Sequence, residues 1–110
     1  MARFSLRIGN GLAAAGFGIA AFALAPAFAA NPTHGGEIAK RWCAACHVVA
    51  DDQKHAADNV PTFASIGRRP GVTADSIATF LRDPHPKMPD MQLSRPESED
   101  LAAYIVSLGK

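Results

Sequence analysis

The chain has 110 residues, with 11 Lys or Arg against 10 Asp or Glu and a formal net charge of +1. This length accommodates one small domain. The near-neutral balance excludes the concentrated basic face that nucleic-acid binding requires, and it says little about a protein partner.

The first 29 residues have the pattern of a secretory signal peptide. Two arginines precede an apolar stretch at 11–25, and Ala27-Phe28-Ala29 fits a small-x-small cleavage site. We therefore predict a signal peptide at 1–29, cleaved after Ala29 or a neighbouring residue, and a periplasmic domain at 30–110 with no stable membrane insertion. The alternative is an uncleaved membrane anchor, since the apolar stretch nearly reaches spanning length. Its high Ala and Gly content favours cleavage.

The predicted mature segment contains few large apolar side chains. It carries roughly nineteen large apolar side chains, so a domain of this size needs a staple such as a disulfide, a metal or a cofactor. No stretch shows sustained strand-like alternation, which indicates an all-α fold.

A first helix is expected to begin at Asn31-Pro32, a cap residue followed by a proline at the first helical position. It continues to Trp42 and into a cysteine motif. One face of this helix is flat enough for another helix to approach closely. That face consists of Gly35, Gly36 and Ala39.

The motif Cys43-Ala44-Ala45-Cys46-His47 follows this helix directly and matches the attachment signature of a c-type haem. Two cysteines on one turn can form thioether bonds to the two vinyl groups of one porphyrin. The adjacent imidazole of His47 can then bind the iron as an axial ligand. We therefore predict one covalently bound haem c.

Two other readings of the cysteine pair remain open. A redox-active disulfide between Cys43 and Cys46 would be expected within a βαβ pattern, which this sequence lacks. A zinc site normally needs four ligands and a second cluster, whereas the remaining histidines are scattered. They are His34, His55 and His85.

Residues 48–72 are rich in loop-forming residues and predict at most a short helix near 63–66. A second clear helix is expected over 74–82, with Thr73 as its cap and an apolar stripe along one side. The stripe consists of Ile77, Phe80 and Leu81.

A stiff, proline-rich loop at 84–90 precedes the last helix and contains Met88. A thioether on the opposite face of the haem would complete the iron coordination and raise its reduction potential. After signal removal the candidates are Met88 and Met91, and position favours Met88, with Met91 packing in the pocket. His85 and Lys87 are nitrogen-bearing rivals in the same loop.

The last helix has the clearest start of all. Ser94 and Glu97 fit a capping box, and the acidic run that follows suits the positive end of the helix dipole. Leu101, Tyr104, Ile105 and Leu108 recur with helical spacing, and Gly109 is a suitable stop.

With these motifs in place, the chain resembles a short bacterial class I cytochrome c over essentially the whole mature segment. The resemblance rests on Cys-x-x-Cys-His, on Val60-Pro61-Thr62-Phe63, and on Met88-Pro89 ahead of a Tyr-containing terminal helix. Larger family members carry long insertions between His47 and Met88, which this chain lacks.

The resemblance implies a fold of three to four short helices wrapped around the haem, with the first and last helices crossing where Gly35 or Gly36 and Ala39 face Tyr104. It also implies a role for each residue of the haem site. Cys43 and Cys46 are the thioether anchors, His47 and Met88 are the iron ligands, and Pro61 offers its carbonyl to the His47 ring N–H.

The function implied is that of a one-electron carrier, not an enzyme, between periplasmic or membrane-bound redox proteins. The donor would be a dehydrogenase or a bc1-type complex, and the acceptor an oxidase or a reductase. Two alternatives stay open. One is a haem-based catalyst or gas binder with an open sixth iron position, and the other is a dedicated electron-accepting subunit of a dehydrogenase.

Overall fold

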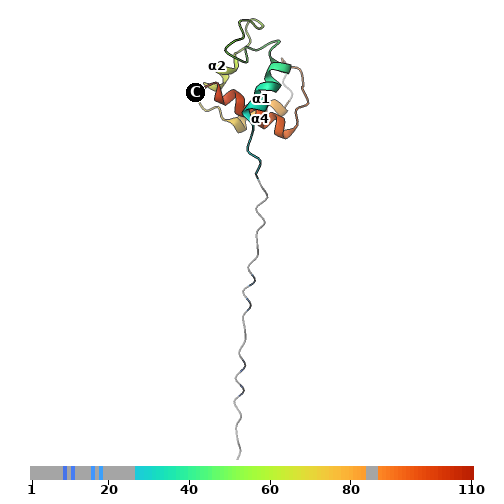
Figure 1. Cartoon of the computed structure of the whole chain (residues 1–110), viewed down its shortest axis with the longest axis vertical. Helices are drawn as coiled ribbons and strands as arrows, with labels where there is room; N and C mark the ends of the chain where they lie inside the picture. The colour runs from blue at the N-terminus through green and yellow to red at the C-terminus, as the bar shows by residue number, and fades with distance from the viewer. Residues whose placement is uncertain (1–8, 10, 12–15, 17, 19–26, 84–86) are drawn as a thin grey trace, which may run out of the picture.

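The computed structural model describes residues 27–83 and 87–110, together with the isolated glycines at 9, 11, 16 and 18. Most of the predicted signal peptide lies outside the described residues. Five helical segments make up the secondary structure of the described part, which contains no strand, so the all-α prediction is confirmed (Figure 1). They are α1 (Pro32–Ile38), η1 (Ala39–Cys43), α2 (Phe63–Gly67), α3 (Ala74–Arg82) and α4 (Arg95–Ser107).

Helix α1 begins where the sequence predicts. The Asn31 side chain accepts hydrogen bonds from the backbone N–H groups of Thr33 and His34, at 3.0 and 3.2 Å. The expected single helix changes character at Ala39, however, where the π-helical turn η1 begins. Here the Ala44 N–H donates to the Ala39 carbonyl at 3.1 Å, five residues back. The first motif cysteine, Cys43, therefore ends a widened turn rather than a regular α-helix, and Cys46 follows that turn.

Helices α1 and α4 cross at close range, as predicted (Figure 1), because Gly35 and Gly36 of α1 face α4 at the contact. A Cβ atom on Gly35 would overlap the Asp100 carbonyl group of α4, and one on Gly36 would lie 3.1 Å from the Tyr104 ring. Glycine is therefore required at position 35, where the two backbones approach, whereas at position 36 the Tyr104 ring would have to shift slightly.

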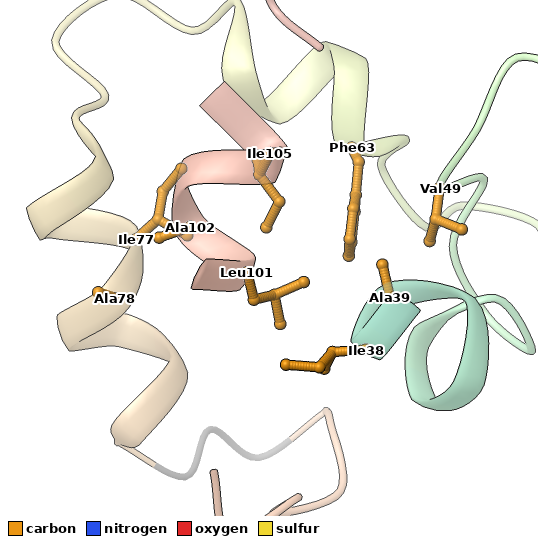
Figure 2. Close-up of a cluster of buried hydrophobic side chains, with 9 residues drawn as sticks. All are labelled: Ile38, Ala39, Val49, Phe63, Ile77, Ala78, Leu101, Ala102 and Ile105. Carbon is orange, nitrogen blue, oxygen red and sulfur yellow. The ribbon is translucent and has the colours of Figure 1, made fainter. Parts of the chain in front are cut away.

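The apolar core lies between α4 and the other elements (Figure 2). Helix α4 contributes its buried face, and α1, η1, α2 and α3 each contribute one or two side chains. The buried set is Ile38, Ala39, Val49, Phe63, Ile77, Ala78, Leu101, Ala102 and Ile105. These nine side chains form a modest core, consistent with a domain that folds around a cofactor.

Helix α3 has the predicted cap but a different buried stripe. Thr73 and Ser76 form a reciprocal capping box at its start. The helix buries Ile77 and Ala78, whereas Phe80 is 53% exposed. The prediction is confirmed for Ile77 and for Leu81, which packs against the core while partly buried, and it is wrong for Phe80, because α4 packs on α3 along the line of Ile77 and Ala78.

Candidate functional site

The cysteine motif forms a compact turn at the end of η1. The N–H groups of Cys46 and His47 both donate to the Cys43 carbonyl, at 3.1 and 2.8 Å. Cys43 is partly buried and Cys46 is exposed, and both are free thiols. The turn thus presents two thiols and one imidazole within five consecutive residues.

The imidazole of His47 is buried and oriented. His47 is only 8% exposed, and its Nδ1 donates to the Pro61 carbonyl oxygen at 2.6 Å. The Phe63 ring lies beside it, with centroids 5.2 Å apart and planes inclined by 49°. With Nδ1 engaged, Nε2 is the ring nitrogen left for other interactions, and it has no hydrogen-bond partner in the described part of the chain. A buried imidazole in this state fits a metal ligand.

The environment of Cys43 does not activate its thiol as a nucleophile. Burial, with a smaller contribution from the neighbouring Cys46, raises the pKa of Cys43 to about 11. A reactive cysteine needs a lowered pKa, since the thiolate is the nucleophile. Residues 27–83 and 87–110 contain no group of three or more His, Cys, Asp or Glu placed to hold a metal ion.

Gln53 holds this turn in place, a role that its sequence context does not indicate. Its side chain accepts from the Val49 N–H at 2.9 Å and donates to the carbonyls of Ala44 and His47, at 3.0 and 2.8 Å. It lies in a segment that the composition marks only as a loop, and no periodicity or motif distinguishes it there.

Met88 and Met91 are both partly buried in the segment before α4. Neither is among the partly buried side chains that pack against the apolar core. Lys87 is exposed, and His85 lies outside the described residues. The structure therefore brings His47 and Pro61 together, and among the described residues it shows no contact of Met88 with either of them. The role of Met88 as an iron ligand stays a prediction.

Two shallow pockets lie behind the motif, next to Val49 and Gln53, with volumes of about 210 and 250 Å³. Neither is lined by a motif cysteine, by His47 or by Met88. Both are smaller than the roughly 300–1,000 Å³ typical of organic-ligand sites, so neither is a cavity for a porphyrin.

Comparison of the sequence with known proteins identifies its family. Residues 30–105 match the family model described as cytochrome c oxidase, cbb3-type, subunit III. The chain is also 57% identical over 82 residues to a cytochrome c-552 of Bradyrhizobium diazoefficiens, a match that covers 74% of this chain and 79% of that protein. The chain belongs to the cytochrome c family. No solved structure matches it closely.

Membership settles the broad biochemistry of this small class I cytochrome c. It is a monohaem c-type electron-transfer protein rather than an enzyme, and its cofactor is a covalently bound haem c with one iron. Its partners are redox proteins, and cytochrome c domains are typically exported. Among the described residues, the structure contains no helix long and apolar enough to cross a membrane.

Proposed function

We propose that Cys43 and Cys46 bind the haem through thioethers and that His47 and Met88 are the two axial ligands of its iron. The observation that carries this assignment is the buried His47 ring, fixed through Nδ1 by the Pro61 carbonyl at 2.6 Å. That contact selects the tautomer in which Nε2 is free to coordinate. The resemblance of Met88-Pro89 to the family pattern supports the sixth ligand.

Two residues of this chain then act on the His47 imidazole. Pro61 keeps the proton on Nδ1 and limits rotation of the ring. Phe63, only 4% exposed, supplies an apolar neighbour to the ring and lowers access of water to this side. Bound haem supplies the one-electron Fe(II)/Fe(III) couple, for which a His/Met ligand pair favours a raised potential.

We further propose that residues 1–29 are a cleaved signal peptide and that residues 30–110 act in the bacterial periplasm. The donor is a dehydrogenase or a bc1-type complex, and the acceptor is an oxidase or a reductase. The description of the matching family model, a subunit of a cbb3-type oxidase, supports an oxidase as acceptor. Encounters are expected to be brief and to bury little surface.

The test is production of the full chain in a bacterium that has the haem-attachment machinery. The periplasmic fraction is analysed by haem staining after denaturing electrophoresis and by intact mass with N-terminal sequencing. We expect one haem per chain, a new N-terminus at Ala30, and loss of stain in Cys43→Ala and Cys46→Ala. A chain that keeps residues 1–29 in the membrane would overturn the processing proposal. Haem stain that persists in both single variants would overturn the assignment of Cys43 and Cys46 as anchors.

A further inference from the structure

Gln53 spans the attachment turn from behind. Its Oε1 accepts from the Val49 N–H at 2.9 Å, while its Nε2 lies 3.0 Å from the Ala44 carbonyl, 2.8 Å from that of His47 and 3.1 Å from that of His55. The chemistry fixes this orientation of the amide. A flipped amide would place its oxygen against three carbonyls and its NH₂ against an N–H group.

The backbone groups that Gln53 engages have few other partners. Within the described residues, Gln53 is the recorded hydrogen-bond partner of the carbonyls of Ala44 and His47 and of the Val49 N–H. Val49 is only 1% exposed, so its N–H would be buried without a partner if the amide were lost. The local fold therefore depends on this one side chain.

The same contacts restrict the position of His47, the proposed iron ligand. Ala44 and His47 lie at the two ends of the segment 44–47, which contains Cys46. By holding both carbonyls, Gln53 fixes the backbone of this segment between Cys43 and the His47 imidazole. Pro61 fixes the ring of His47 and Gln53 fixes its backbone. Together these contacts leave the imidazole little freedom in position or rotation.

We propose that Gln53 is a positioning residue for electron transfer, which sets the orientation of the His47 imidazole towards the iron. This inference rests on the proposed ligation by His47. Because the side chain is neutral and lies against the backbone, it acts through geometry rather than through charge at the iron. Its loss should alter the electronic structure of the haem as well as the stability of the fold.

The test compares the holoprotein with Gln53→Leu, which keeps the bulk of the side chain and removes every amide contact. Two readouts are the reduction potential and the hyperfine-shifted proton NMR resonances of the oxidised form, which depend on the plane of the axial imidazole. We expect both to shift in Gln53→Leu. The control for general destabilisation is Thr73→Ala, which removes the cap of α3 outside the attachment turn. The control for the loop surface is Lys54→Ala. Both controls should match wild type in both readouts.

A second variant keeps the experiment decisive if Gln53→Leu yields no holoprotein. Gln53→Glu retains the acceptor for Val49 and loses the donors at neutral pH, and protonation at acid pH restores one donor. We expect altered resonances at neutral pH that move towards wild type as pH falls. Haem-bearing Gln53 variants with the wild-type potential and resonances would overturn this inference alone. A wild-type chain without thioether-linked haem would overturn the proposed function and this inference with it.

Discussion

The Tyr104 hydroxyl donates a hydrogen bond of 2.6 Å to the carbonyl oxygen of Val49, two residues after His47. The ring of the same tyrosine lies against Gly36 of α1. Burial raises the pKa of Tyr104, with smaller contributions from the carboxylates of Asp51 and Asp52, so the hydroxyl remains a donor at neutral pH. One side chain of α4 thus connects the helix crossing to the segment that carries the attachment motif.

Tyr104→Phe should therefore destabilise the holoprotein while leaving the helix crossing intact. The ring stays in place, but the buried Val49 carbonyl loses its recorded partner, at a cost of about 1–2 kcal/mol. Guanidinium unfolding of the oxidised protein, followed by the haem absorbance, measures this cost. An unchanged midpoint would show that the hydroxyl contact contributes nothing to stability.

The two glycines of α1 should differ sharply when each is replaced by alanine. At Gly35 the added Cβ overlaps the α4 backbone at Asp100, which can move only with the helix. At Gly36 it meets the edge of the Tyr104 ring, which can shift slightly. Overpacking typically costs about 1–3 kcal/mol, and more where backbone must move.

The measurement is the yield and unfolding midpoint of each holoprotein, with Glu37→Ala on the exposed side of α1 as control. We expect Gly36→Ala to be recovered with a lowered midpoint and Gly35→Ala to give little or no holoprotein. Equal behaviour of the two glycine variants would contradict the crossing geometry.

Asp100 should make stability depend on acid pH. Its burial disfavours the charged form, but the Asn31 N–H at 2.6 Å and the His34 imidazole at 2.7 Å outweigh this and lower its pKa. A carboxyl group whose pKa is lowered by folding stabilises the protein above its unfolded value of about 3.9, and that stability disappears as pH falls through the folded value.

The measurement is the free energy of unfolding of wild type and Asp100→Asn from pH 6 downward. The two curves should be furthest apart at the upper end and converge below about pH 4, where the wild-type carboxyl becomes protonated. A constant difference over the whole range would mean that ionisation of Asp100 does not stabilise the contact between α1 and α4.

Replacing Met88 by Ala should lower the reduction potential and open the iron to ligands such as imidazole or cyanide, because a thioether raises the potential and fills the sixth position. Spectral titration with imidazole and a redox titration measure the two effects. Met91→Ala is the matched control and should behave like wild type. The reverse pattern would make Met91 the ligand, and ligand binding by the wild type itself would favour an open sixth position.

Much of the fold was predictable because its signals are local. The caps at Asn31, Thr73 and Ser94 and the side chains of α4 depend on neighbours within a few residues, and the structure shows each of them. The adjacent glycines Gly35 and Gly36 indicated that some helix could approach α1 closely, and the family resemblance implied that this helix is the last one.

What the sequence did not indicate depends on contacts between distant segments. Gln53 and Asp100 are ordinary polar residues in their local context, and only the fold brings Asp100 against Asn31, 69 residues earlier in the chain. The π-helical turn at Ala39 and the exposure of Phe80 likewise depend on how whole helices pack, which the apolar pattern does not encode.

The most direct test of the haem site is the visible spectrum of the purified exported protein, oxidised and then reduced. We expect the sharp bands of a low-spin c-type haem on reduction, and in the oxidised form a weak band near the red end of the visible range from the bond between methionine sulfur and Fe(III). That weak band should disappear in Met88→Ala and persist in Met91→Ala. A colourless protein, or a haem protein whose weak band survives in Met88→Ala, would contradict the site assigned to Cys43, Cys46, His47 and Met88.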